Sequence, residues 1–167
     1  AGDGNIRVKT LSIELSIKDI TILEKIKKLL KANNKITTRT RLHPVTQNYF
    51  TNCCLTISRK KMCEDLTKLG ITSNKSNILK MPPIKSELIA HFLRGMVCSD
   101  GNFTVNNENC MTFTFVCPVY DFIKEFQDIL IRELNFEKTD IPFKRGCYKL
   151  RYNGNYQVRK LFEYLYP

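Results

Sequence analysis

Two aspartates stand far apart in the chain within the same short sequence. The segment 3–6 reads Asp-Gly-Asn-Ile, and the segment 100–103 reads Asp-Gly-Asn-Phe. Carboxylates are the oxygen ligands that Mg²⁺ takes from proteins, and a bound Mg²⁺ with open positions can activate water and stabilise charge on a phosphodiester. A single Asp-Gly is a common turn sequence. Because this one recurs at equivalent places of the chain, Asp3 and Asp100 are interpreted as functional residues and not as turn residues alone.

The segments that follow the two aspartates repeat the same order of expected elements. Alternation predicts strands at 11–17 and 111–116. Helical spacing then predicts a helix in each copy, with the apolar stripe Ile22, Leu23, Ile26, Leu29 and Leu30 in the first and Phe122, Ile123, Phe126, Ile129 and Leu130 in the second. Two more strands and a closing helix follow, at 35–41, 53–58 and 60–69 in the first copy and at 141–145, 148–152 and 156–166 in the second.

This order predicts an α+β fold of two pseudo-symmetric repeats with antiparallel sheets. The second copy has one more helix in front, 85–98, with Ser86 as its N-cap. The equivalent helix of the first copy would lie upstream of Ala1, so we expect the first repeat to start at the end of its helix. A connection rich in Ser, Asn, Lys and Pro spans 72–83. The predicted domains are residues 1–83 and 84–167.

The charge balance favours a polyanionic partner. Lys and Arg number 27 against 16 Asp and Glu, a formal net charge of +11, and nucleic acid is the commonest reason for such an excess. No apolar run approaches the roughly 18 residues of a membrane span. The seven cysteines form no CxxC pair, and the two histidines lie far apart, which disfavours zinc. We expect reduced, buried thiols and therefore an intracellular protein in a reducing compartment with access to DNA.

Basic residues lie on or beside the expected strands. Pairs two residues apart, Arg39 with Arg41 and Lys149 with Arg151, must share one face of a sheet. Such a stripe can contact base edges or phosphates, although a solvated charged face is the alternative. The predicted DNA contacts are Arg7, Lys9, Arg39, Arg41, Lys144, Arg145, Lys149 and Arg151. The lysines of the first helix, Lys25, Lys27, Lys28 and Lys31, are interpreted as its solvated face.

The segment 93–101, Leu-Arg-Gly-Met-Val-Cys-Ser-Asp-Gly, resembles the LAGLIDADG motif, and the segment 2–4 resembles its tail. Together with the repeated order of elements, the whole chain resembles a single-chain, two-repeat LAGLIDADG homing endonuclease. The resemblance implies that the two motif helices pack side by side, where Gly95 allows close approach. It also implies that the sheets form a saddle in the major groove of double-stranded DNA.

The resemblance further implies the roles of individual residues. Asp3 and Asp100 would bind Mg²⁺ or Mn²⁺, and the backbone carbonyls of Gly2 and Ser99 would complete the coordination. Arg151 occupies the place of a basic group that supports catalysis, with a plain phosphate contact as the alternative. Its counterpart in the first half is Thr56, for which Lys60 or Lys61 could substitute. The sequence departs from the motif at its earlier acidic position, which holds Cys98 in one copy and Ala1 in the other.

The sequence thus predicts a site-specific, divalent-metal-dependent DNA endonuclease that acts as a monomer with internal two-fold pseudo-symmetry. Intron or intein mobility is the implied setting. The alternative is a non-cutting nucleic-acid binder on the same scaffold, an intron maturase or a DNA-binding regulator. Retention of both aspartates favours the nuclease, since a binder has no need of paired carboxylates.

Overall fold

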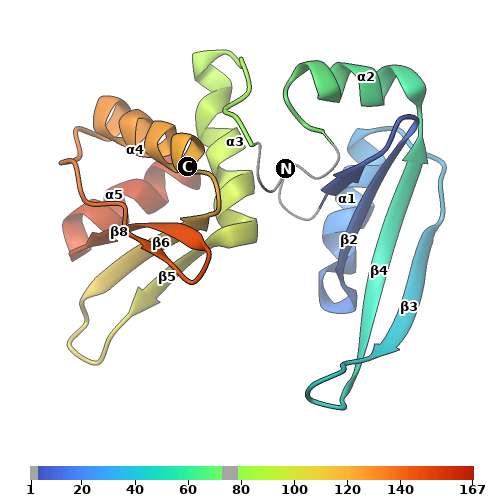
Figure 1. Ribbon diagram of the computed structural model, residues 1–167, viewed down its shortest axis with the longest axis horizontal. Coiled ribbons are helices and arrows are strands. Elements are labelled where there is room, and N and C mark those ends of the chain that lie inside the picture. The colour runs from blue at the N-terminus through green and yellow to red at the C-terminus, as the bar shows by residue number, and fades with distance from the viewer. Residues whose placement is uncertain (1–3, 73–78) are drawn as a thin grey trace. The chain divides into compact units, whose positions relative to one another are not determined.

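The computed structural model describes residues 4–72 and 79–167, which divide into two compact units (Figure 1). Each unit contains one four-stranded antiparallel sheet with helices packed against it. The prediction of an α+β fold built from two antiparallel sheets is therefore confirmed. None of the helices in the described ranges is long and apolar enough to cross a membrane.

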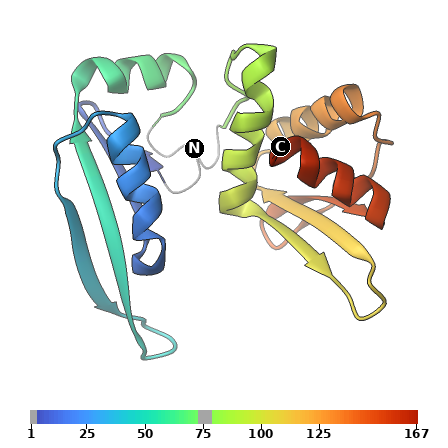
Figure 2. The same ribbon diagram turned by 180° about the vertical axis from the view of Figure 1, so that it is seen from behind.

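The first unit follows the predicted order strand, strand, helix, strand, strand, helix. The strands pair in the order β1-β2-β4-β3, and a short 3-10 turn at Ile17–Asp19 leads from β2 into α1. The elements are β1 (Gly4–Ile6), β2 (Thr10–Ser16), α1 (Ile20–Leu29), β3 (Ile36–Leu42), β4 (Tyr49–Ser58) and α2 (Lys60–Lys68). Figure 2 shows α1 lying along one side of this sheet.

Alternation along β4 creates the core of the first unit. Cys53, Leu55 and Ile57 are buried and face α1, where Leu23 is fully buried. The residues between them face the other side of the sheet, because successive strand residues point to opposite faces. One face of the sheet is therefore apolar and covered by the helix, and the other is polar and open.

The second unit repeats this order with one helix added in front. Its strands pair in the order β5-β6-β8-β7. The elements are α3 (Ser86–Asp100), β5 (Gly101–Val105), β6 (Met111–Cys117), α4 (Tyr120–Leu134), β7 (Phe143–Lys144), β8 (Cys147–Asn153) and α5 (Asn155–Leu165).

Aromatic side chains fill the core of the second unit. Phe113 and Phe115 of β6 are fully buried, as are Phe122 and Phe126 of α4. The rings of Phe115 and Phe126 stack with their centroids 4.8 Å apart. This core is larger than that of the first unit because α3, α4 and α5 all contribute buried residues to it.

Several local predictions differ from the structure. Ser86 is the first helical residue and Lys85 the N-cap, without a side-chain cap hydrogen bond. The strand expected at 141–145 shortens to Phe143–Lys144, because Arg145 and Gly146 both adopt positive φ (54° and 82°) in the two-residue turn that starts β8.

Burial also differs from the expectation in α1 and at some cysteines. Leu29 is 81% exposed, because α1 ends at this residue and its buried stripe runs through Leu23. Cys53, Cys63 and Cys117 are buried as predicted, but Cys98 is exposed, since it lies on the side of α3 opposite the buried Leu93, Met96 and Val97. The remaining three cysteines are half-buried.

The connection between the units lies partly outside the described residues, at 73–78. Leu79 is buried in the core of the second unit, and Met81 packs against it. Both precede residue 84, where the sequence predicts that the second domain begins. The boundary itself stays a prediction.

Candidate nucleic-acid interface

The open face of the first sheet is lined with polar side chains in rows across the strands. Asn5 pairs with Ser12, and Ser12 pairs with Thr56. The hydroxyls of Ser12 and Thr56 lie 3.1 Å apart. Further along the strands, Arg39 pairs with Asn52. Paired residues of an antiparallel sheet point to the same side, so these side chains form one polar surface.

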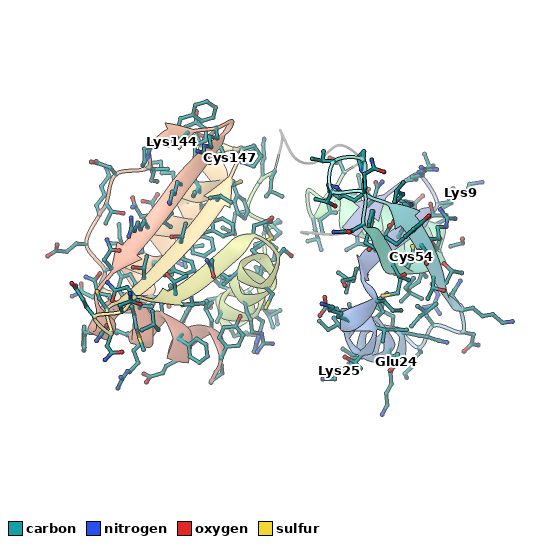
Figure 3. All side chains as sticks on the ribbon, turned by 90° about the horizontal axis from the view of Figure 1, so that it is seen from below. Lys9, Glu24, Lys25, Cys54, Lys144 and Cys147 are labelled. Carbon is teal, nitrogen blue, oxygen red and sulfur yellow. The ribbon has the colours of Figure 1, made fainter. Side chains whose placement is uncertain are left out.

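A shallow hollow of about 600 Å³ lies on this open face. It is lined by Arg7 and Arg39 with the neutral polar residues Asn5, Thr10, Ser12, Thr37 and Thr56, and by Glu14 and Cys54. Figure 3 labels Cys54 on this unit, and Lys9 in the turn that precedes β2. Donors, acceptors and positive charge are thus combined on one surface, which is the chemistry that DNA backbone and base edges require.

Glu14 organises the other end of the same face. Its Oε1 accepts a hydrogen bond from Asn52 Nδ2 at 2.9 Å and lies 3.6 Å from Arg41 Nη1. The three residues come from three adjacent strands. Glu14 therefore positions an amide and a guanidinium on the open face, although half-exposed ion pairs of this kind contribute little to stability.

The open face of the second sheet carries Lys149 and Arg151. Arg151 pairs with Thr114, which pairs with Asn102 on β5. Arg151 Nε donates to Asn153 Oδ1 at 3.0 Å, and Thr112 donates to the same oxygen at 3.0 Å. These contacts hold the guanidinium along the strand, in the row that begins two residues after Asp100.

The basic residues spaced by two along a strand share one face of the sheet, as predicted. Arg39 and Arg41 lie on the open face of the first sheet, and Lys149 and Arg151 lie on that of the second. Arg7 lines the hollow just after β1. Lys144 ends β7, whereas Lys9 and Arg145 lie in turns outside the strands. Their part in DNA binding stays a prediction.

Asp100 is the last residue of α3 and is exposed. Its carboxylate acts electrostatically on Cys117 at the end of β6. Burial raises the pKa of the Cys117 thiol, a hydrogen bond from the Val119 N–H partly lowers it, and the charge of Asp100 raises it again. The carboxylate therefore lies at the junction of α3 and β5, near Cys117 at the end of β6.

Gly101 has a structural reason to follow Asp100. A Cβ at this position would lie 2.7 Å from the carbonyl oxygen of Val97 and 2.7 Å from its Cγ1. Only glycine allows the chain to turn so closely from α3 into β5. Gly95 is not required in the same way. A Cβ at Gly95 would lie more than 4 Å from every other described residue that could obstruct it.

The donor types at this junction fit a hard divalent cation. Asp100 offers carboxylate oxygens, and the Ser99 hydroxyl donates back to Gly95 O at 3.3 Å, so Ser99 offers its backbone carbonyl. Mg²⁺ and Ca²⁺ both take such oxygen ligands. Within the described ranges, no group of three or more His, Cys, Asp or Glu side chains forms a metal centre. Gly2 and Asp3, the other predicted ligands, lie outside the described residues.

Lys60 and Lys61, the alternatives to a basic group at Thr56, lie in the first turn of α2. Their ammonium groups are 3.7 Å from Glu64 and 3.7 Å from Asp65, respectively. Both lysines therefore pair with carboxylates of their own helix. Thr56 occupies the position in the first sheet that Arg151 occupies in the second. Thr56 pairs with Ser12 and Arg151 pairs with Thr114, and these two partners lie at equivalent places in their sheets.

Comparison with known proteins identifies the fold. No protein-family model matches the sequence, and no curated protein matches it. Among solved structures, the homing endonuclease I-WcaI bound to its DNA recognition sequence is similar over 98% of this chain and 75% of that one, with a TM-score of 0.69 and 14% identity.

Two further structures have the same fold. The N-terminal LAGLIDADG domain of DUF199/WhiA matches 99% of this chain and 76% of its own, with a TM-score of 0.62 and 14% identity. I-SmaMI bound to uncleaved DNA in the presence of calcium ions matches 99% and 81%, with a TM-score of 0.59 and 14% identity.

The chain therefore has the two-repeat LAGLIDADG fold, and the resemblance seen in the sequence is confirmed at the level of the fold. Identities of this size establish architecture, and function is argued from the residues of the site.

The structure adds candidate residues that the sequence reasoning missed. Glu14, Asn52, Asn5 and Asn102 all lie on open faces. Counting every second residue along the strands would have found them, because the same alternation selected Arg39 and Arg41. The sequence prediction did not include them because it was based on cationic side chains alone.

Proposed function

We propose that the protein binds double-stranded DNA on the open faces of its sheets and cleaves it as a divalent-metal-dependent endonuclease. The observation that supports this most directly is the exposed carboxylate of Asp100 at the end of α3, where the chain enters β5 of the sheet that carries Lys149 and Arg151. The same Asp-Gly-Asn sequence precedes the open face of the first sheet. Proteins of this fold have been solved bound to DNA, including I-WcaI on its recognition sequence.

The proposed chemistry assigns each group a separate task. A divalent cation, Mg²⁺ or Mn²⁺, supplies Lewis acidity and an activated water when bound. The carboxylates of Asp3 and Asp100 would hold it, and the carbonyls of Gly2 and Ser99 would add oxygen ligands. Arg151 lies in the row that begins at Asn102, so its guanidinium can stabilise negative charge on the phosphate.

Recognition of the target would come from the strands. Arginines such as Arg39 can bond guanine edges, and amides such as Asn52 can bond adenine edges in the major groove. Glu14 would accept from the amino group of a cytosine, or hold Arg41 and Asn52 in the geometry seen here. Such a surface discriminates sequence through its pattern of donors and acceptors, while phosphate contacts supply affinity.

The second candidate is a non-cutting nucleic-acid binder on the same scaffold, a maturase or a regulator. Two observations favour it. The earlier acidic position of the motif is held by the exposed Cys98, and Thr56 gives the first unit no cation at the place of Arg151. A binder would keep the open faces and need no carboxylates.

A cleavage assay on a plasmid library separates the two candidates. The protein is incubated with supercoiled plasmids that carry randomised inserts, with Mg²⁺ or with EDTA, and the open-circular and linear products are sequenced. The nuclease predicts products at a specific site only with the metal. The binder predicts a different result. The protein would retain plasmids that carry its binding sequence, and no metal-dependent product would appear at any site of the library.

We further propose that the protein acts as a monomer with two-fold pseudo-symmetry, one domain on each half of the DNA site. Its working place would be a reducing compartment that contains DNA, as the free cysteines indicate. Intron or intein mobility is the setting that this activity would serve.

A further inference from the structure

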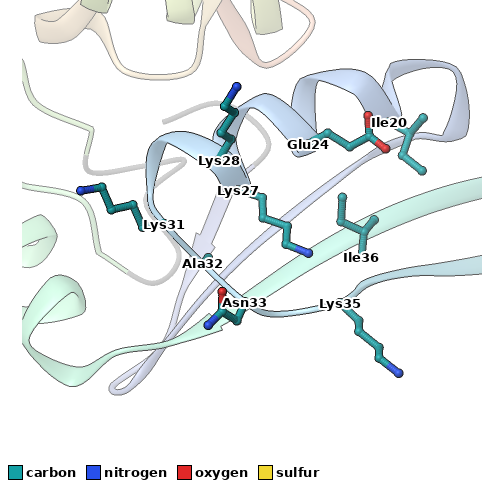
Figure 4. A pocket seen from close by; sticks show the side chains of 9 residues that line it. All are labelled: Ile20, Glu24, Lys27, Lys28, Lys31, Ala32, Asn33, Lys35 and Ile36. Atoms are coloured by element: carbon teal, nitrogen blue, oxygen red, sulfur yellow. The ribbon is translucent and has the colours of Figure 1, made fainter.

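A second basic surface lies on the first unit, away from the open face of its sheet. It is a hollow of about 730 Å³ between the end of α1 and the start of β3. Figure 4 shows its lysines around this corner, with Glu24 on the helix above. The residues that line it are Ile20, Glu24, Lys27, Lys28, Lys31, Ala32, Asn33, Lys35 and Ile36. We call it the α1–β3 hollow.

The α1–β3 hollow concentrates positive charge. Four lysines and one glutamate line it, a difference of three positive charges, and Figure 4 shows Lys28 and Lys31 pointing away from Lys27 and Lys35. Within the described part of the chain, none of the ion pairs involves Lys27, Lys28, Lys31 or Lys35. Lys27 is half-buried and the other three lysines are exposed. The charge of the hollow is therefore available to a ligand.

Lys31 has a backbone conformation that is unfavourable for a residue with a side chain. It follows the end of α1 with φ of 47°, the left-handed conformation in which glycine is unstrained. At the equivalent corner of the second unit, where α4 ends, the left-handed residue is Asn135 (φ 53°), a residue that tolerates this region. A lysine at this strained position is explained if its ammonium group has a use.

Stabilising the helix end accounts for Lys27 and Lys28, which lie in the last turn of α1, but not for Lys31 and Lys35. Arg59 already caps α1, since its Nη1 donates to Leu30 O at 3.2 Å and its Nη2 to Lys31 O at 3.1 Å. Lys160 performs the same task for α4, donating to Leu134 O at 2.9 Å. Lys31 and Lys35 also lie beyond the last helical turn, where the interaction with the helix dipole has faded.

We propose that the α1–β3 hollow binds the phosphate backbone of a single nucleic-acid strand. Its cations are all lysines, compact charges on flexible stems that bind phosphate oxygens as point charges. The floor holds Ile20, Ala32 and Ile36 and no aromatic ring, so bases are not stacked and binding is independent of sequence. A flexible single strand can follow lysines that point to different sides of this corner, whereas a duplex is stiff on this scale.

This site is separate from the proposed DNA-cleavage face. The helix α1 covers one side of the first sheet through Leu23 and its neighbours, while Arg39, Glu14 and Thr56 face the other side. The two surfaces share no lining residue. A strand in the hollow and a duplex on the open face can therefore be bound together.

The test measures the anisotropy of fluorescein-labelled 12-nucleotide oligouridylate and oligothymidylate on the full chain, with unlabelled random duplex in excess to occupy the open faces. Both oligonucleotides are expected to bind, because the phosphate backbone is common to RNA and DNA. Removal of all single-strand binding by the duplex would overturn the proposal. So would equally tight binding of an oligoglutamate of the same charge, which would assign the hollow to an acidic peptide.

A matched pair of variants locates the site. Lys31→Gln/Lys35→Gln should weaken oligonucleotide binding about 10-fold and reduce the slope of log K against log salt by about 1.4, since two phosphate contacts are lost. Lys18→Gln/Lys25→Gln removes the same charge from exposed positions outside the hollow, and Figure 3 labels Lys25 on α1. Equal loss in the two double variants would mean that only net charge matters.

A single glycine variant distinguishes a ligand-binding lysine from a structural one. Lys31→Gly relieves the left-handed strain, so the melting temperature should rise by about 2 °C, while oligonucleotide affinity falls about 3-fold. Unchanged affinity in this stabilised variant would exclude Lys31 from the site.

Discussion

At the scale of single residues, the Asp-Gly pair at 100–101 combines a glycine with a structural task and an aspartate with a proposed chemical task. Gly101 is required because any Cβ would collide with Val97. Asp100 is exposed at the end of α3, where a negative charge faces the unfavourable end of the helix dipole. In the proposed site, this carboxylate would bind the cation.

The first prediction concerns Asp100→Asn. It removes the charge at nearly constant shape, so metal-dependent cleavage should fall at least about 1,000-fold while DNA affinity changes less than about 3-fold. Cleavage and equilibrium binding are measured on the same target. Asp140→Asn, which removes an exposed acidic group from a loop of the same unit, is the control and should keep full activity. Loss of folding in Asp100→Asn would instead indicate a structural role.

The second prediction follows from the different residues at equivalent places, Thr56 and Arg151. If Arg151 stabilises charge on one scissile phosphate, the strand served by the first unit should be cut about 10-fold or more slowly. Nicked plasmid should then accumulate before linear product. Thr56→Arg should shorten the nicked phase, and Arg151→Gln should slow the first cut. Equal rates for both strands in the unaltered protein would contradict this assignment without touching the nuclease proposal.

Lys149→Gln is the matched control for Arg151→Gln. Lys149 lies on the same face of β8, two residues away. Its loss should weaken binding modestly and leave the ratio of nicked to linear product unchanged.

At the scale of elements, the junction of α3 and β5 sets the position of the candidate site. The N–H of Gly101 still bonds to Val97 O, and the backbone then becomes extended, with φ −100° and ψ 159°. This abrupt change brings Asp100 to the edge of the sheet and places Asn102 on the open face. The geometry of the site thus depends on the tight helix-to-strand transition.

The third prediction is that Gly101→Ala destabilises the second unit. The added Cβ must displace Val97, and overpacking of this kind costs about 1–3 kcal/mol. Urea denaturation followed by circular dichroism gives the change in the free energy of unfolding. Thr104→Ala on the same strand, where the side chain is exposed, should cost less than about 1 kcal/mol. Equal losses in the two variants would show that the close approach is not the cause.

At the scale of the whole molecule, the net charge of +11 is spread over surfaces with different tasks. Arginines and lysines lie on the open faces of both sheets, and another group of lysines lines the α1–β3 hollow. Charge that is distributed in this way attracts a polyanion to the protein before any specific contact forms.

The fourth prediction is a steep salt dependence of duplex binding. About six neutralised phosphates imply a slope of log K against log salt near −5, and Lys149→Gln should reduce its magnitude by about 1 if this lysine contacts a phosphate. Fluorescence anisotropy between 50 and 300 mM salt, over which the Debye length falls from about 14 Å to about 6 Å, gives the slope. A flat response would contradict binding through the basic sheet faces.

The sequence by itself determined the order of the elements and the duplication. Periodicity is a local property, so the alternating strands and the helices could be predicted within a few residues. It also determined that Arg39 shares a face with Arg41, and Lys149 with Arg151, because this follows from strand geometry alone. The short β7 escaped prediction because positive φ at Arg145 is decided by the turn that pairs it with β8.

Only the tertiary structure decided which side chains from different elements come together. Glu14, Arg41 and Asn52 meet across three strands, and Lys31, which is exposed as predicted, lines one hollow with Lys35 and α1. The physical reason is that such contacts depend on strand register and on how a helix packs against its sheet. Register and packing are set by many weak interactions across the whole unit, and no local pattern encodes them.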